Sequence, residues 1–172
     1  LCKSTRVFAE ARFMMDALLM AGANLFRDLP PTPLLEPEDD EEEPFMDPAW
    51  PHLAVVYEFL LQVVSLPAVP RATSKACFTV GFFQPLFNVF LSNDKREREA
   101  LKNVVHEMYG SVTLRRSVMR RCINHTFYRF AFESDQHSGI AQMLDIMSSI
   151  ITGFKLPIKS RHKSTFKRAD RK

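Results

Sequence analysis

Glycine, cysteine and long apolar runs are all scarce in this sequence, and each scarcity excludes a class of protein. The 172 residues include five glycines, and none of them forms a glycine-rich loop that could cradle phosphate groups. Cys2, Cys77 and Cys122 stand far apart without a C-x-x-C spacing, which favours reduced thiols in an intracellular protein. No apolar run approaches the roughly 18 residues of a membrane span, and the first residues lack the apolar core of a signal peptide. We therefore expect no membrane span and a cytoplasmic or nuclear location, or both.

Patterns that would support catalysis or metal binding are also missing. The five histidines are scattered, with no H-E-x-x-H and no paired His/Cys spacing. The acidic block EPEDDEEE (36–43) lacks the D-x-D-x-D-G geometry of a calcium loop and is interpreted as a solvated linker. The sequence therefore predicts no enzyme activity, no cofactor and no metal.

The charge distribution is uneven although the formal net charge is only +3. The segment KLPIKSRHKSTFKRADRK (155–172) is strongly basic and could face nucleic acid or an acidic membrane surface. Aromatic side chains for base stacking are few there, with Phe154 and Phe166 in this region. We therefore expect no nucleic-acid partner.

What the sequence does contain is helical apolar spacing along most of its length. This spacing predicts helices at 8–29, 49–64, 75–92, 93–110, 114–132 and 138–154. The prolines and repelling carboxylates of 29–48 predict an exposed loop. The predicted fold class is all-α, built from a chain long enough to bury a core.

Residues with known preferences for helix ends refine these predictions. Asp47 suits an N-cap with Pro48 as the first helical residue. Asp94 with Glu97 resembles a capping box. Two glycines, Gly110 and Gly153, are predicted C-terminal stops, and Pro85 should kink or shorten its helix.

The predicted helices also recur at a regular interval. Pairs that start near Ala49, Asn93 and His137 are spaced by about 44 residues, the period of HEAT or armadillo repeats. This period predicts a HEAT-like α-solenoid of antiparallel pairs over 1–163, truncated before a basic polar tail at 164–172. A plain helical bundle is the alternative.

Paired side chains on successive helices indicate a peptide-binding groove. His106 and Tyr109 are spaced i, i+3, and Arg116 and Arg120 are spaced i, i+4, so each pair shares a helix face. The remaining candidates, spaced in the same way, are Ile146 with Ile150 and Lys159 with His162. An apolar strip flanked by cations and a tyrosine hydroxyl suits a short ligand with apolar anchors and an acidic residue. Alternatively, the isoleucines are core residues and the cations are solvated.

Several blocks of this sequence resemble the B-prime regulatory subunit family of protein phosphatase 2A. They are LFRDLPP (25–31), AWPHLAVVYEFLL (49–61), NDKREREALK (93–102), INHTFYRF (123–130) and SGIAQMLDIMSSIITGFKLPIK (138–159), in the order of the family. The resemblance runs from about Ala21 to Lys163 and matches the N-terminal part of longer proteins. It implies a HEAT-like solenoid that binds the phosphatase scaffold and catalytic subunits and recruits substrates.

The resemblance also implies a groove for short acidic Leu-x-x-Ile-x-Glu motifs. The family's groove residues correspond to His106, Tyr109, Arg116, Arg120, Ile146, Ile150, Lys159 and His162 of this sequence. Glu107 departs from the family, which has arginine there, and places a repulsive charge beside the expected acidic ligand. The sequence thus predicts a non-catalytic targeting subunit, with a phosphatase-independent helical-repeat adaptor as the alternative.

Overall fold

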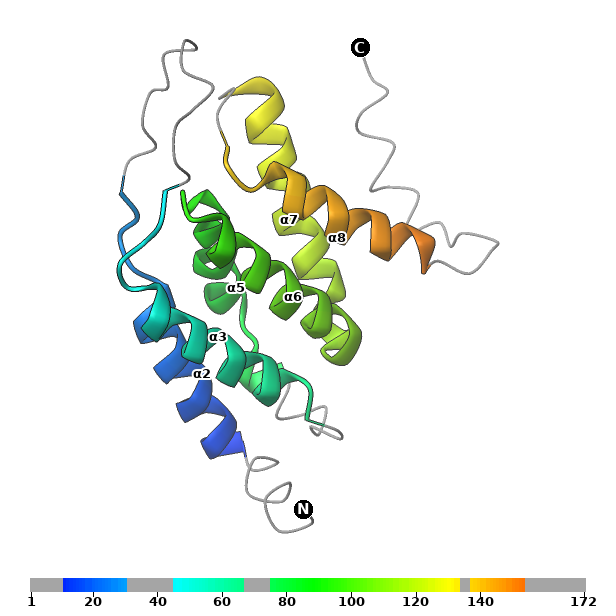
Figure 1. Ribbon diagram of the computed structural model, residues 1–172. Coiled ribbons are helices and arrows are strands. Elements are labelled where there is room, and N and C mark those ends of the chain that lie inside the picture. The colour runs from blue at the N-terminus through cyan, green and yellow to red at the C-terminus, as the bar shows by residue number, and fades with distance from the viewer. Residues whose placement is uncertain (1–10, 31–44, 67–74, 134–136, 154–172) are drawn as a thin grey trace.

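The computed structural model describes residues 11–30, 45–66, 75–133 and 137–153, and within these ranges every regular element is a helix (Figure 1). The α-helices are α2 (Ala11–Leu25), α3 (Trp50–Val64), α5 (Val80–Asn88), α6 (Lys95–Ser111), α7 (Arg116–Phe132) and α8 (Ile140–Thr152). Two short 3-10 helices, η1 (Val89–Leu91) and η2 (Thr113–Arg115), follow α5 and precede α7. The all-α prediction is confirmed. The predicted tail at 164–172 and most of the predicted loop lie outside the described residues.

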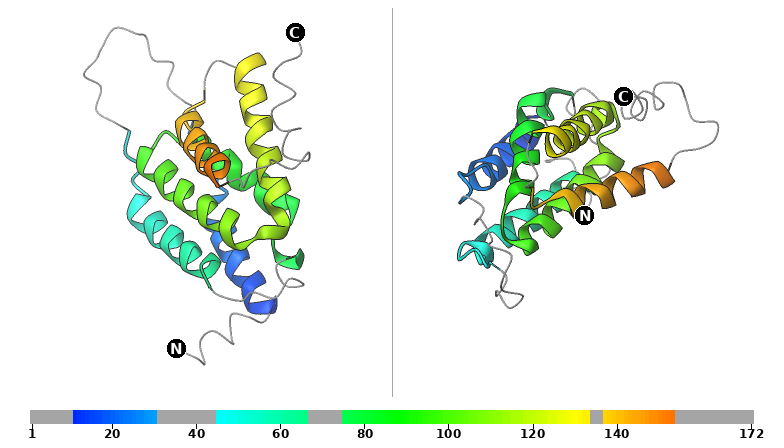
Figure 2. Two further views of the ribbon diagram at one scale, coloured as in Figure 1. Left: turned by 90° about the vertical axis from the view of Figure 1, so that its right-hand side faces the viewer. Right: turned by 90° about the horizontal axis from the view of Figure 1, so that it is seen from above.

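The helices form two layers, as the three views in Figures 1 and 2 show. In one layer α3, α6 and α8 lie side by side, and in the other α2, α5 and α7 do so. The helices of the first layer begin at residues 50, 95 and 140, so equivalent helices recur every 45 residues. Because α2 and α8 lie at opposite ends of this open stack, the solenoid prediction is confirmed and the closed bundle is excluded.

The assignment of helices to pairs differs from the prediction. The helices that start near Ala49, Asn93 and His137 are equivalent to one another, as their period indicated. However, α3 packs on α2, α6 follows η1, and α8 packs on α7, so these helices are the second members of their pairs. A period alone cannot distinguish first from second members, because it fixes only the spacing.

Several helix ends also differ from the prediction. The α3 helix starts at Trp50 with Ala49 as N-cap, while Asp47 accepts a hydrogen bond from the Ala49 backbone N–H at 2.8 Å. The predicted helix 75–92 is interrupted before α5, where the Thr79 hydroxyl accepts from the Phe82 N–H at 3.3 Å. Pro85 lies inside α5, which changes to the 3-10 helix η1 four residues after it.

Other helix ends agree with the sequence. The Asp94 side chain caps α6 by accepting from the Arg96 N–H at 2.8 Å, and Gly153 is the C-cap of α8. Gly110, in contrast, does not stop α6, which continues to Ser111.

A buried charge network joins the first helices of the stack. Arg27 donates to both carboxylate oxygens of Glu97, at 2.7 and 2.9 Å, and to Asp47 at 2.7 Å. The Tyr57 hydroxyl donates to Glu97 at 3.0 Å, and the Glu97 side chain is fully buried. The hydrogen bond to Glu97 is the main cause that raises the pKa of Arg27. Glu97 was predicted to complete a capping box, but instead it connects the start of α6 with α3 and with the segment after α2.

Candidate functional site

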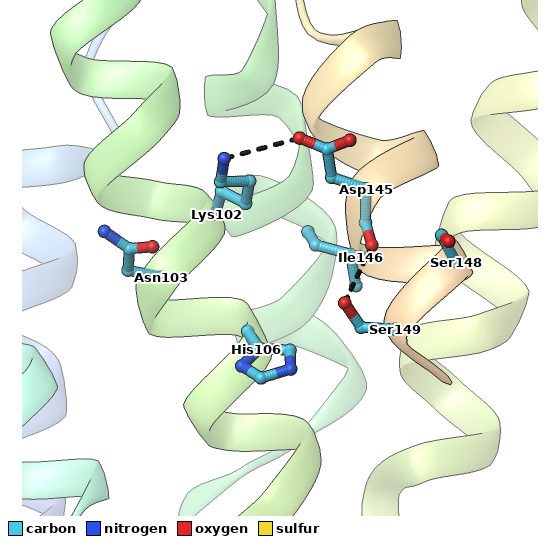
Figure 3. Close-up of a pocket in the computed structure, with 7 residues that line it drawn as sticks. All are labelled: Lys102, Asn103, His106, Asp145, Ile146, Ser148 and Ser149. Carbon is cyan, nitrogen blue, oxygen red and sulfur yellow. Dashed lines mark hydrogen bonds and ion pairs between the residues drawn. The ribbon is translucent and has the colours of Figure 1, made fainter. Parts of the chain in front are cut away.

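A hollow of about 400 Å³ lies between the neighbouring helices α6 and α8 (Figure 3). Its lining comes from one face of each helix and consists of Lys102, Asn103, His106, Asp145, Ile146, Ser148 and Ser149. Side chains spaced i, i+3 or i, i+4 share a helix face, so the regular spacing along α6 and α8 puts these groups opposite each other. The lining is mainly polar, with Ile146 as its apolar element.

Polar contacts bridge α6 and α8 along this hollow. The Lys102 ammonium pairs with Glu99 at 2.6 Å and with Asp145, across the gap, at 3.4 Å (Figure 3). The Gln142 amide donates to Glu99 at 2.8 Å. The Glu99 contact raises the pKa of Lys102, and the contacts from Lys102 and then Gln142 lower the pKa of Glu99. Both groups are therefore charged at neutral pH, and each also contacts a side chain of α8, Asp145 for Lys102 and Gln142 for Glu99.

A second cluster, of two arginines around Tyr109, lies where α6 ends and α7 begins. Arg116 donates from Nε to the Tyr109 carbonyl at 2.6 Å and from Nη2 to the Gly110 carbonyl at 3.0 Å. Its guanidinium also lies 5.1 Å from the centre of the Tyr109 ring. Arg120 donates from Nη1 to the Tyr109 hydroxyl at 2.6 Å. Arg116 thus satisfies carbonyls that the end of a helix leaves unpaired, and Arg120 retains further donors.

The structure brings most of the predicted site residues to these two places. His106 and Ile146 line the hollow from opposite helices. Tyr109 lies one turn beyond His106 on α6 and accepts hydrogen bonds from Arg116 and Arg120. Ile146 and Ile150 are only 1% and 5% exposed, so they belong to the core and form no open apolar strip. Lys159 and His162 lie outside the described residues.

Five lining residues were missed in the sequence: Lys102, Asn103, Asp145, Ser148 and Ser149. Lys102 is i, i+4 from His106, and Ser149 is i, i+3 from Ile146, so a search of the same helix faces would have found them. Glu107 is half-buried and is not among the residues that line the hollow.

Two further features of the described residues bear on function. They contain no group of three or more His, Cys, Asp or Glu side chains that could hold a metal ion. No helix in the part of the chain that the structure describes is long and apolar enough to cross a membrane.

An open two-layer stack of helix pairs, with a polar hollow between adjacent helices of one layer, defines a helical-repeat protein suited to binding another polypeptide. Comparison with sequence families gives the particular family. The family described as "Protein phosphatase 2A regulatory B subunit (B56 family)" matches residues 4–169. This chain belongs to that family.

Individual relatives agree with this assignment. The chain is 42% identical to the B' theta isoform of the 57 kDa regulatory subunit of serine/threonine protein phosphatase 2A from Arabidopsis thaliana, over 91% of this chain and 33% of that protein. It is 43% identical to the delta isoform of the human 56 kDa regulatory subunit, over 86% of this chain and 25% of that protein. The chain thus spans between a quarter and a third of the length of these curated relatives.

Proposed function

We propose that this chain contributes to a non-catalytic regulatory subunit of a protein phosphatase 2A complex and binds substrates through acidic Leu-x-x-Ile-x-Glu motifs. Its partners would be the scaffold and catalytic subunits of the phosphatase together with substrate proteins. Membership of a family of regulatory subunits supports this role. The observation that carries the motif-binding part is the Tyr109–Arg116–Arg120 cluster, one helical turn from the hollow that His106 lines.

The two ends of such a motif have different requirements. The ligand glutamate needs donors, and Arg120 offers those that its bond to Tyr109 leaves unused. A charge-assisted hydrogen bond of this kind contributes about 1.5–3 kcal/mol. The ligand isoleucine needs an apolar contact. Ile146 lines the hollow but is only 1% exposed and belongs to the core, so the cations around Tyr109 support this proposal and the apolar contact does not.

Replacing Arg120 tests this proposal more cleanly than replacing Arg116. Because Arg116 binds two backbone carbonyls at the end of α6, replacing it disturbs the helix as well as the groove. Arg120 binds the Tyr109 hydroxyl, so Arg120→Gln removes a charge without removing a helix cap. Arg129→Gln makes the same chemical change on the same helix, at an exposed position away from the cluster, and is the matched control.

The experiment is titration of the chain with an acidic Leu-x-x-Ile-x-Glu peptide and with the same peptide carrying alanine for its final glutamate. Arg120→Gln should weaken binding of the first peptide about tenfold, while Arg129→Gln should leave it unchanged. If both peptides bind equally and Arg120→Gln has no effect, the motif-binding proposal is wrong. Copurification of the scaffold and catalytic subunits from cell extract tests the rest, since a phosphatase-independent adaptor would not retain them.

A further inference from the structure

An exposed serine lies beside the arginine cluster and has no role in the groove described above. Ser117 is the second residue of α7 and is exposed. Its hydroxyl has no hydrogen-bond partner among the residues that the structure describes. In the sequence it stands in Leu-Arg-Arg-Ser-Val-Met-Arg-Arg (114–121), with arginines at the two positions before it and at the third and fourth positions after it.

The arginines after Ser117 lie on its own face of α7. Residues spaced i, i+3 and i, i+4 are neighbours on a helix surface, so Arg120 and Arg121 both lie within reach of a group attached to Ser117. Arg121 is exposed and forms no ion pair within the described residues. Arg120 is half-buried, and one of its nitrogens binds the Tyr109 hydroxyl. An acidic group attached to Ser117 could bind the guanidinium groups of Arg120 and Arg121. Arg120 is also part of the candidate groove, where it binds the Tyr109 hydroxyl.

We propose that Ser117 is a phosphorylation site for a basophilic protein kinase and that its phosphate weakens binding of acidic motifs to the adjacent groove. The kinase transfers the γ-phosphoryl group of a nucleoside triphosphate to the Ser117 oxygen. The new O–P bond replaces the bond to the departing nucleoside diphosphate, and the hydroxyl proton passes to a base of the kinase. Protein kinases select substrates by charge pattern, and the arginines around Ser117 supply the cationic pattern.

The segment just before Ser117 is suited to local opening, whereas Val118 and Met119, directly after it, are buried and would have to leave the core for a kinase to bind an extended segment. The preceding 3-10 helix η2 has no buried residue, and neither η2 nor α7 begins with a side-chain cap. Segments with few buried contacts open locally at low cost in free energy. Reclosure places the phosphate in the first turn of α7, near the positive end of the helix dipole, which favours an anion.

The effect on the groove follows from competition for the same cations and rests on the proposed function. A phosphate adds about −1.5 to −2 charges at neutral pH and accepts several hydrogen bonds. It therefore neutralises Arg121, draws on the donors of Arg120, and repels the acidic residue of the ligand. Phosphorylation should weaken an acidic Leu-x-x-Ile-x-Glu peptide about tenfold, the change expected when one charge-assisted hydrogen bond is lost.

The first test asks whether the site is modified. The chain is treated with the catalytic subunit of a cyclic-nucleotide-dependent kinase and ATP, and the phosphate is located by mass spectrometry. Ser117→Ala should abolish it. Ser111→Ala is the control, because Ser111 is also exposed but has no arginine within three positions on either side, and this change should leave the phosphate in place. If Ser117 stays unmodified while a standard substrate peptide is phosphorylated in the same tube, the proposal is wrong.

The second test separates this proposal from the peptide-binding function. The phosphorylated chain should melt about 2–4 °C above the unmodified chain, because the phosphate gains contacts with Arg120 and Arg121. The gain should disappear when both arginines are replaced by glutamine. Peptide titration should also show weaker binding after phosphorylation, and removal of the phosphate by a phosphatase should restore the original affinity. If the unmodified chain does not bind the peptide, the proposed peptide-binding function is wrong, and so is the proposed effect of phosphorylation on that binding. The melting shift still tests whether the phosphate contacts Arg120 and Arg121. A chain phosphorylated at Ser117 with neither a melting shift nor weaker binding would overturn the proposed contacts with Arg120 and Arg121 and the proposed effect on the groove.

Discussion

At the scale of single residues, Glu97 is a position where loss of a partner should be costly. Its carboxylate is fully buried, and its partners are the Arg27 guanidinium and the Tyr57 hydroxyl. Burial is the main cause that raises the pKa of Tyr57, and the neighbouring Glu97 charge raises it further, so the hydroxyl stays protonated and donates. A buried ion pair adds little net stability compared with an apolar pair, but removing one partner leaves an uncompensated charge.

Arg27→Met should therefore destabilise the protein by about 2–3 kcal/mol. The value lies slightly below the range for fully buried pairs because Arg27 is 24% exposed. Arg129→Met is the control, since Arg129 and Glu133 form a pair on the surface, with both side chains more than half exposed. Loss of that pair should change stability by at most about 0.5 kcal/mol. Urea unfolding measures both changes. Equal losses of unfolding free energy in the two variants would show that the buried pair is worth no more than the surface pair.

Asp47 and Asp94 lie close to this network, and their lowered pKa values predict that the protein loses stability in acid. The backbone N–H of Ala49 is the main cause that lowers the pKa of Asp47. Burial opposes ionisation of Asp94, but hydrogen bonds from Arg96 and from the Asp47 backbone outweigh it and lower its pKa. A pKa lowered by folding contributes stability that is present above the unfolded value of 3.8 and is lost as the pH falls through the folded value.

The urea midpoint should thus fall as the pH drops below about 5 and should continue to fall toward pH 3. Asp94→Asn keeps an acceptor at the N-cap of α6 but removes one titrating group. This variant should start less stable at neutral pH and should lose less stability on acidification. An unchanged pH dependence in Asp94→Asn would show that Asp94 does not contribute.

At the scale of elements, two glycines near helix ends should respond oppositely to the same change. A Cβ on Gly139, at the start of α8, would lie 2.4 Å from the Phe90 carbonyl oxygen, which is too close for any real contact. A Cβ on Gly110, within α6, would meet nothing within 4 Å. Gly139→Ala should destabilise the protein by about 1–3 kcal/mol through overpacking, and Gly110→Ala should stabilise it by about 0.5–1 kcal/mol. Thermal unfolding distinguishes the two, and a stabilised Gly139→Ala would contradict the close approach of Gly139 to Phe90.

The helix ends show which elements local sequence can predict. Asp94 was predicted correctly because a capping aspartate acts within its own first turn. Gly110 was predicted wrongly as a stop, because Arg116 from the next helix binds the Tyr109 and Gly110 carbonyls and thereby supports the end of α6. The break before α5 was missed because the apolar run of 75–92 fits one buried helix as well as two.

At the scale of the whole molecule, the candidate site contains features that local sequence predicts and features that depend on how the helices stack. Helical spacing correctly groups residues on one face, which is how His106 was placed with Tyr109. Spacing cannot decide whether a face packs inward or lines a groove, so Ile146 and Ile150 were expected to form an open strip although they are nearly buried. The pairing of Lys102 with Asp145 depends on which helices stack, and this follows from the fold alone.

The stacked architecture also predicts unequal local stability, which amide hydrogen exchange can measure. The α6 helix lies between α3 and α8 and also packs on η1, and its buried residues extend from Glu97 to Met108. The α7 helix is buried only at Val118, Met119 and Ile123, so its second half contributes little to the core.

Amide exchange should therefore be slowest in α6 and much faster in residues 124–132 of α7, where Tyr128 and Phe132 are exposed. In a solenoid each repeat is stabilised by its neighbours, so damage at one end should spread only to adjacent helices. Arg27→Met should thus accelerate exchange in α2, in α3 and at the start of α6, and should leave α7 nearly unchanged. Uniform acceleration along the chain, including α7, would instead indicate that all the helices open together as one cooperative unit.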